Sequence, residues 1–268
     1  MLTSAALQST AQSKPVYQWL ERAPAGTLAG RVALPAGFER VAVAPGSFGE
    51  WLRAIPVKPG KPEVMLFNGE PKYNQQAHSL VLDIDTGNRD LQQCADAVMR
   101  LRAEYLYGSH QYKRISFDFT NGFTCDFATW TKGYRPAVIG NKVSWKKSAT
   151  PDSSYQSFRK YMVQVFTYAG TQSLSRQMKP KAIADIAPGD VFIRGGFPGH
   201  AVIVLDVAVN KSTGDRIFLI AQSYMPAQDM HVLVNPNEPA RAPWYAASFG
   251  EQLLTPEWTF TRNELKTF

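Results

Sequence analysis

The chain has 268 residues, 44% of them hydrophobic and 19% charged, and it carries a net charge of +7. That length allows one large domain or two small ones, and the apolar fraction supplies ample material for a packed core. The longest apolar run, residues 201–209, is interrupted by Asp206, so no segment reaches the roughly 20 apolar residues of a membrane-spanning helix. We therefore expect a soluble protein.

The N-terminal segment, residues 1–16, is small and polar, and we expect it to be flexible. It lacks a basic start and has only a short apolar stretch, Leu2 to Leu7, so it would be no more than the stub of an export signal. No Pro-, Gly- or Ser-rich linker and no internal repeat follows. We therefore predict a single domain over residues 17–268.

The first third of the chain predicts short elements followed by a longer helix. The short elements are a strand at 41–43, a helix from the capping box at Ser47 to Ile55, and strands at 64–67 and 80–84. Asn88 or Asp90 is positioned to cap a helix that runs to about Tyr107. Cys94 falls on the apolar stripe of that helix.

The rest of the chain passes from helices to strands. The predicted elements are a hairpin of 115–119 and 123–127, a strand at 138–145, a helix from Asp152 or Ser153 to Gly170, a helical piece at 172–178, and strands at 191–193, 201–209, 217–221 and 232–234. The late strands are separated by turn residues, as in an antiparallel meander. We expect an α+β domain in which helices pack on that meander.

His200 stands at the head of the strand predicted at 201–209, directly after the loop Gly195–Gly199. Glycines such as Gly199 allow backbone or substrate to approach closely. Because the ordinary pKa of histidine is about 6.5, a histidine beside such a loop is well placed for acid or base catalysis. A hydrogen-bonded histidine at a strand edge, without chemistry, is the competing interpretation.

Gln222 is the first candidate partner of His200. If residues 210–215 close a hairpin, residues 222–225 lie opposite His200, and the Gln222 amide can reach the imidazole and fix its tautomer. A solvated strand-end glutamine is the alternative.

Cys94 is the second candidate partner. A thiol near a helix N-terminus with a histidine beside it has a lowered pKa and becomes a nucleophile. With Asp90 as the cap, however, Cys94 is already the fourth helical residue and lies on the apolar stripe, so a buried structural cysteine is equally compatible with the pattern.

Other chemistry-bearing residues fit structural roles better. Cys125 lies in a predicted strand, and Ser223 lacks the Gly-x-Ser-x-Gly surround of a serine nucleophile. The four histidines are dispersed and form no His-Glu-x-x-His pair, which argues against a zinc hydrolase, and the acids at Asp83 and Asp85 lack the full spacing of a calcium loop. We expect no metal, no cofactor and, because the lysine clusters carry no accompanying motif, no nucleic-acid partner.

Nearly the whole chain, residues 17–260, resembles the bacterial domain-of-unknown-function family 4846. The segments that carry the resemblance are 46–53, 90–106, 168–174, 195–201, 221–228 and 255–258, among them Gly-Gly-Phe-Pro-Gly-His-Ala and Ala-Gln-Ser-Tyr-Met-Pro-Ala-Gln. The family name implies no activity.

The order of Cys94, the Pro188–Asp190 turn, His200 and Gln222 is more distantly similar to NlpC-like and papain-like cysteine hydrolases. This resemblance implies a papain-like core and a thiol hydrolase or acyltransferase acting on an amide or ester, with Cys94 attacking, His200 moving the proton and Gln222 orienting it. By analogy it implies action in the periplasm or cell envelope on a peptide or glycan-peptide.

The rival hypothesis is an inert binding or scaffold domain of the same shape. Its groove would be lined by aromatic side chains and rimmed by basic ones for an acidic glycan or peptide. The candidate lining residues are Tyr224, Trp244, Tyr245 and Trp130, next to the glycine loop that ends at Gly199.

Overall fold

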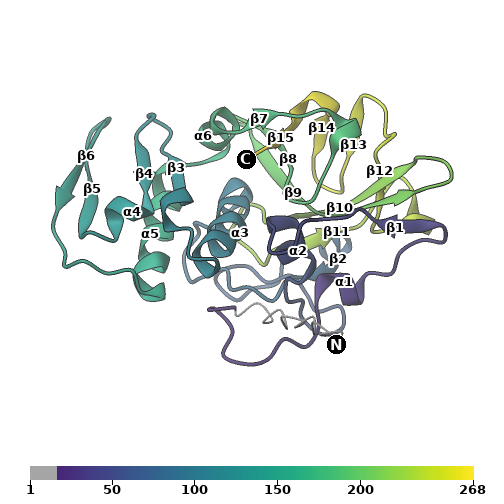
Figure 1. Ribbon diagram of the computed structural model, residues 1–268, viewed down its shortest axis with the longest axis horizontal. Helices are drawn as coiled ribbons and strands as arrows, with labels where there is room; N and C mark the ends of the chain where they lie inside the picture. The colour runs from purple at the N-terminus through teal and green to yellow at the C-terminus, as the bar shows by residue number, and fades with distance from the viewer. Residues whose placement is uncertain (1–16) are drawn as a thin grey trace, which may run out of the picture.

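The structure is a computed structural model that describes residues 17–268, so the predicted flexible segment 1–16 lies outside the described residues. Helices and an antiparallel sheet are combined in it, as the sequence predicts (Figure 1). The α-helices are α1 Leu28–Arg31, α2 Phe48–Arg53, α3 Cys94–Gly108, α4 Phe127–Trp130, α5 Tyr155–Tyr168 and α6 Thr171–Gln177. Short 3-10 turns are Gln75–Ala77, Tyr112–Arg114, Ile183–Asp185, Pro239–Arg241 and Arg262–Glu264.

Two long strands form the spine of a nine-stranded sheet. Its strands are β1 Phe38–Arg40, β2 His78–Val81, β7 Lys179–Pro180, β8 Val191–Arg194, β9 His200–Asn210, β10 Arg216–Gln222, β11 His231–Leu233, β12 Tyr245–Ala246 and β15 Leu265–Thr267. The order is β2-β11-β10-β9-β8-β15-β7, with β1 paired to β9 and β12 to β10. Strands β8 to β11 are successive antiparallel neighbours, which confirms the predicted meander.

Strand β9 is covered on both faces, and its alternating side chains separate two cores. Ala201 and Ile203 pack in the core that contains α3. Val202 and Val204 point to the other face and pack with Phe260, which lies in a hairpin of β13 Gln252–Leu254 and β14 Thr259–Thr261. A near-continuous apolar run is the pattern expected of a strand buried on both sides.

Asp206 interrupts that run because it pairs with two arginines. Arg40 Nε donates to one carboxylate oxygen and Arg53 Nε to the other, each at 2.6 Å. The Asp206 side chain is fully buried, and a buried carboxylate needs such partners to offset its loss of hydration. The pair of ion pairs attaches β1 and α2 to the middle of β9.

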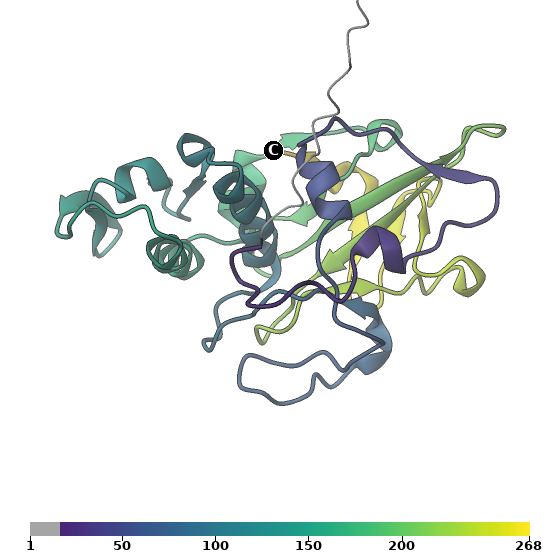
Figure 2. The same ribbon diagram turned by 60° about the horizontal axis from the view of Figure 1, so that its bottom comes forward.

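A lobe of residues 109–168 lies on the far side of α3 from the sheet (Figures 1 and 2). It contains α4, α5 and two hairpins, β3 Ser116–Asp118 with β4 Thr124–Asp126, and β5 Tyr134–Ile139 with β6 Lys142–Lys147. A contact with α3 joins it to the rest: the Tyr155 hydroxyl of α5 donates at 2.8 Å to Glu104 Oε1, the same oxygen that accepts from Arg100 Nε of α3 at 2.6 Å.

Three predicted strands were wrong in extent. The strand expected at 41–43 is instead β1, because residues 38–40 pair with the end of β9, where the long spine strand has a free edge. Residues 64–67 make only isolated bridges at Met65 and Leu66. The strand expected at 138–145 is a hairpin that turns at Gly140, whose φ of 59° suits glycine.

No helix within residues 17–268 has the length and apolar character needed to cross a bilayer.

Candidate functional site

His200 is the first residue of β9 and is fully buried. Gly199 makes this position possible, because a Cβ at residue 199 would lie 2.8 Å from the Arg194 carbonyl oxygen and closer still to Thr171 Oγ1 and the Gly196 carbonyl oxygen. The loop therefore packs against β8 and α6 at a distance that only glycine permits. Gly199 thus positions His200.

Gln222 lies beside His200, as the hairpin register predicts. Ala221 pairs with Ile203, so the next side chain along β10 projects on the same face as His200. The Gln222 Oε1 atom is 2.9 Å from His200 Nε2. The amide nitrogen of Gln222 is 2.7 Å from Glu257 Oε2 and 3.3 Å from His231 Nε2.

These neighbours determine the orientation of the Gln222 amide. An ionised carboxylate only accepts hydrogen bonds, so the NH2 group of Gln222 must face Glu257 and its carbonyl oxygen must face His200. The Gln222 oxygen in turn needs a donor, which places the ring proton of His200 on Nε2. The Nδ1 atom of His200 is left with a lone pair, and it is buried without a hydrogen-bond partner among the described residues.

Burial, which outweighs the hydrogen bond to Gln222, lowers the pKa of His200 to about 4. His231 is equally buried, and its pKa is lowered to about 3. Both imidazoles are therefore neutral at pH 7, and His200 holds a free basic nitrogen.

A buried ion pair, Lys72 with Glu257, lies next to His200, Gln222 and His231. Together with Tyr224 these residues form the His200 cluster. Lys72 Nζ lies 2.5 Å and 2.6 Å from the two carboxylate oxygens of Glu257, and 5.5 Å from the centre of the Tyr224 ring. The Tyr224 ring contacts the His200 ring at 4.7 Å between centres. Sequence reasoning missed Lys72, Glu257 and His231, because Lys72 and Glu257 are separated by 185 positions and no local pattern joins them.

Cys94 is the first residue of α3, with Gln93 at the N-cap. The predicted caps, Asn88 and Asp90, were wrong, because the Asp90 carboxylate accepts hydrogen bonds from the Ala227 amide at 2.6 Å and from the Gln93 side chain at 2.8 Å. Asp90 thus joins two loops and caps no helix. Cys94 therefore occupies the first turn of the helix, where free backbone amides favour a thiolate.

The surroundings of Cys94 nevertheless keep its thiol neutral. The residue is 7% exposed, and burial together with the nearby Asp96 raises its pKa to about 12. Cys94 and Gln222 both line a narrow void between α3 and the sheet, too small for a water molecule. Within residues 17–268 no hydrogen bond joins Cys94 to His200: Cys94 packs on the α3 face of the sheet, whereas His200 contacts Trp258 and Phe260 on the other.

The end of β10 connects these two faces. The Ser223 hydroxyl lies 3.0 Å from the carbonyl oxygen of Gln92, two residues before Cys94, and 2.9 Å from that of Gln228. Ser223 is therefore a structural link. Tyr224 follows immediately, and its pKa is raised by burial and by the proximity of Cys94 and Glu257. Residues 222–224 thus lie between the thiol and the imidazole.

Of the expected ligand-binding aromatics, only Tyr224 lies beside His200, where it is half-buried. Trp244 is 1% exposed in the α3-side core, where its indole nitrogen donates to the Ala33 carbonyl oxygen at 2.9 Å. Tyr245 and Trp130 are buried as well. The structure therefore does not bring these three residues into a groove at the His200 cluster.

The remaining candidates have structural partners. Cys125 is fully buried in β4. Asp85 forms ion pairs with Arg100 at 3.0 Å and with Arg159 at 2.6 Å, so its carboxylate has a structural role. Among residues 17–268 no three His, Cys, Asp or Glu side chains are grouped as metal ligands.

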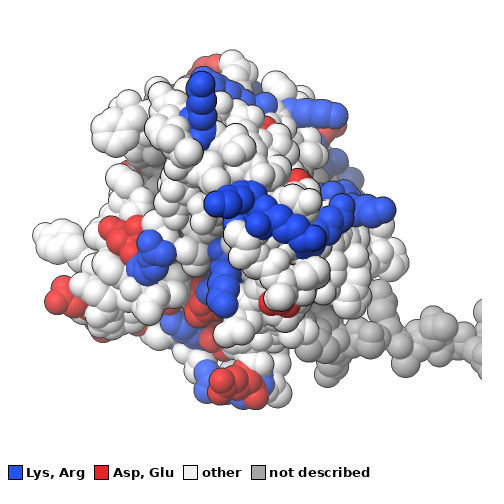
Figure 3. Space-filling model, turned by 90° about the vertical axis from the view of Figure 1, so that its left-hand side faces the viewer, with Lys and Arg blue, Asp and Glu red and all other residues white. Residues whose placement is uncertain are grey.

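Positive charge is concentrated on the side of the molecule that carries the lobe (Figure 3). Residues 109–181 contain twelve Lys and Arg but only three Asp and Glu, whereas the rest of the chain has seventeen and nineteen. The net charge of the whole protein is therefore that of one region, and the His200 cluster lies outside it.

Comparison with known proteins places the chain in a family without adding a solved relative. Neither a curated protein nor a solved structure matches it, and the likeness to NlpC-like hydrolases gains no support from these comparisons. A family model described as a domain of unknown function (4846) matches residues 28–267, which is most of the chain and includes every residue of the His200 cluster. The chain belongs to that family.

Proposed function

We propose that this protein is a cysteine-dependent hydrolase or acyltransferase, amidase- or peptidase-like, that uses Cys94, His200 and Gln222. The observation that carries the proposal is the unprotonated Nδ1 of His200, which has no hydrogen-bond partner among the described residues. Gln222 fixes this ring form, and the next residue of the chain, Ser223, contacts Gln92, two residues before Cys94. An unprotonated ring nitrogen, oriented by an amide, is the arrangement that a thiol nucleophile needs. Action in the cell envelope on a peptide or glycan-peptide rests on the distant resemblance alone.

The proposed reaction begins from neutral partners. As the Cys94 sulfur attacks the carbonyl carbon of an amide or ester, its proton passes to His200 Nδ1, and a C–S bond forms. The imidazolium then gives that proton to the leaving amine or alcohol as the C–N or C–O bond breaks. Water, or another acceptor, releases the acyl group from sulfur. Gln222 Oε1 accepts the hydrogen bond from His200 Nε2 throughout, so Nδ1 remains the nitrogen that takes up and returns the proton.

Catalysis by this route requires the thiol and the imidazole to approach. We propose that substrate displaces Tyr224, because this half-buried ring lies against His200 and adjoins the strand end beside Cys94. Because the pKa of His200 is about 4 and that of Cys94 is about 12, the two side chains are both neutral at rest and do not form an ion pair. Activity should accordingly rise as pH increases through about 4, where His200 loses its proton, and persist at neutral pH.

Alkylation by iodoacetamide tests the proposal, with Cys125 as an internal control in the same molecule. We expect iodoacetamide to alkylate Cys94 faster than Cys125 at pH 8. The His200→Ala substitution should slow the alkylation of Cys94 at least about tenfold, since a general base contributes about 10²-fold or more. Peptide mapping separates the two cysteines, and circular dichroism checks the fold of the variant. Equal rates at the two cysteines, unchanged by His200→Ala, would reject the proposal.

A binding domain without chemistry is the second candidate. It is favoured by the burial of both groups, since His200 is fully enclosed and Cys94 is 7% exposed with no bond between them. On this account the cluster only stabilises the fold. Hydrolysis of p-nitrophenyl acetate decides between the two: a rate abolished by Cys94→Ala and retained in Cys125→Ala supports catalysis, whereas equal rates in all three proteins support binding.

A further inference from the structure

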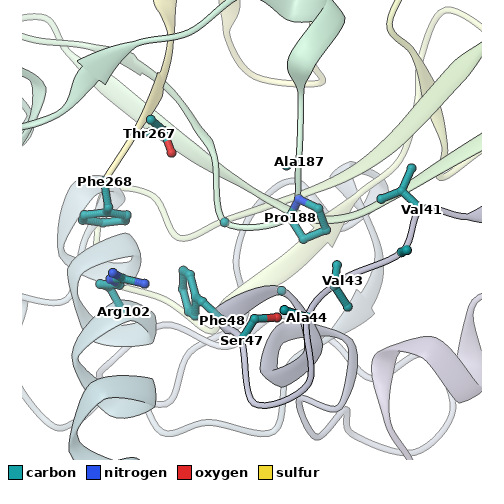
Figure 4. Close-up of a pocket in the computed structure, with 13 residues that line it drawn as sticks. Val41, Val43, Ala44, Ser47, Phe48, Arg102, Ala187, Pro188, Thr267 and Phe268 are labelled. Atoms are coloured by element: carbon teal, nitrogen blue, oxygen red, sulfur yellow. The ribbon is translucent and has the colours of Figure 1, made fainter. Parts of the chain in front are cut away.

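A second cavity lies away from the His200 cluster, where α3, the start of α2 and the Ala187–Gly189 turn meet (Figure 4). Its volume is about 290 Å³, and it opens to the surface. That volume is at the small end of the range for ligand pockets, about 300 to 1,000 Å³. Arg102 and Cys94 are eight residues apart on α3, or about 12 Å along the helix axis, so this cavity is separate from the proposed thiol site.

Arg102 is the charged residue of the cavity wall. Its guanidinium carbon lies 5.0 Å from the centre of the Phe48 ring and 5.1 Å from that of Phe268. Figure 4 shows the side chain leaving α3 beneath the Phe268 ring, with its guanidinium directed toward Phe48. The walls are otherwise mainly apolar, with Val41, Val43 and Pro188 among the lining residues and no acidic residue among those described.

Among the described residues the guanidinium has cation–π partners but no ion-pair partner. The rings cover it by contacts that leave the in-plane N–H groups free. Within residues 17–268 the contacts of the Arg102 guanidinium are with aromatic rings, and it has no ion pair or hydrogen bond. Burial lowers the pKa of Arg102, and the neighbouring positive charge of Arg114 lowers it further, so a bound anion would stabilise the charged guanidinium. A half-buried cation left unpaired in a cavity indicates a ligand that supplies the charge.

We infer that this cavity binds a small organic carboxylate with an apolar body, the carboxylate on Arg102 and the body against Phe48, Phe268 and Pro188. A planar carboxylate matches the guanidinium fork of Arg102, which is the charged residue of the cavity wall. A phosphate dianion would need further donors, whereas the other lining residues are mainly apolar. The source of the carboxylate is either a free organic acid or the C-terminus of a peptide.

Isothermal titration calorimetry with benzoate tests the inference on the whole chain. We expect saturable one-to-one binding, with a Kd near 1 mM for a ligand of nine heavy atoms. Benzamide, which has the same shape without the charge, should bind at least about tenfold more weakly, as should inorganic phosphate. Acetyl-Ala-Phe with a free C-terminus distinguishes the sources: tighter binding than benzoate identifies a peptide end, and weaker binding a free acid.

Variants locate the site. Arg102→Gln should weaken benzoate binding at least about tenfold and Arg102→Lys by less, because lysine keeps the charge but loses the planar fork. Arg176→Gln, an exposed arginine of α6, is the matched control and should bind benzoate as the parent does. Cys94 alkylation should be unaffected by Arg102→Gln, so the two sites are tested independently.

No saturable benzoate binding, equal affinity for benzoate and benzamide, or unchanged affinity in a folded Arg102→Gln protein would each overturn the inference. The benzamide comparison uses the parent protein alone, so the test stands even if a variant fails to fold.

Discussion

At His200 one hydrogen bond determines which ring nitrogen carries the proton, and burial determines that there is only one proton. Glu257 fixes the Gln222 amide, Gln222 fixes the imidazole, and among residues 17–268 Nδ1 of His200 has no hydrogen-bond partner. A buried polar atom without any partner costs about 1 to 3 kcal/mol, so a group that bonds to Nδ1 would be stabilised by it. The role we propose is that of the base for Cys94.

The lowered pKa of His200 predicts acid sensitivity. In the unfolded chain the pKa returns to about 6.5, so between pH 6.5 and 4 the unfolded state binds more protons than the folded state, and stability falls as pH falls. Between pH 7 and pH 5 this histidine alone should cost about 2 kcal/mol.

Urea unfolding of the parent and of His200→Asn at both pH values measures this contribution. The fall in unfolding free energy should be about 2 kcal/mol smaller in the variant. Buried Asp96, whose pKa is raised, contributes with the opposite sign in this range, so the difference between the two proteins is the quantity to compare. Parallel pH dependence in both would show that His200 is not held neutral.

At the scale of elements, α3 and the β9–β10 pair bring the candidate residues to one end of the sheet. The glycine loop delivers His200 to the start of β9, the end of β10 carries Gln222, and α3 begins at Cys94 beside it. The ends of these elements position the candidate site, because each candidate residue is the first or last of its helix or strand.

Gly199→Ala should therefore lower the stability of the protein by disturbing the loop that positions His200. The added Cβ cannot be accommodated against the Arg194 carbonyl oxygen and Thr171, so we expect a loss of about 2 kcal/mol or more in unfolding free energy. Gly108→Ala, at the open end of α3 where nothing lies within 4 Å, should change stability by less than about 1 kcal/mol. Chemical denaturation compares them, and equal losses would show that Gly199 is not a tight contact.

The sequence was sufficient for the meander and for the Gln222–His200 contact, because hairpin register follows from local turns and alternation. It was insufficient for the start of α3, since Asp90 has the right chemistry for a cap but is used by Ala227, more than 130 residues away. Lys72 and Glu257 lay beyond prediction for the same reason. Trp244 shows the converse: an aromatic residue type suggested a groove, and tertiary packing placed it in the core.

At the scale of the whole molecule, α3 joins a basic lobe to a sheet that holds both candidate sites. The joint is polar as well as apolar: Arg100 is fully buried and contacts Glu104, Asp85 and Gln92, while Tyr155 of α5 donates to Glu104. Such a network holds the lobe in place only while every member is paired.

Glu104→Gln should consequently destabilise the protein by about 3 kcal/mol, because it leaves the Arg100 charge only partly compensated in the interior. The matched control is Glu251→Gln, whose partner Arg262 lies 3.9 Å away at the surface and whose loss should cost less than about 1 kcal/mol. Thermal unfolding separates the two, and similar melting temperatures would contradict a structural role for the buried pair.

The state of His200 at pH 7 tests the central claim most directly, and nitrogen-15 nuclear magnetic resonance of the imidazole rings measures it. We predict a neutral ring with its proton on Nε2, coupled to the Gln222 oxygen, and a change in that signal in Gln222→Met. A proton on Nδ1, or a doubly protonated ring at pH 7, would contradict the account, because His200 would then have no free nitrogen to accept the proton of Cys94.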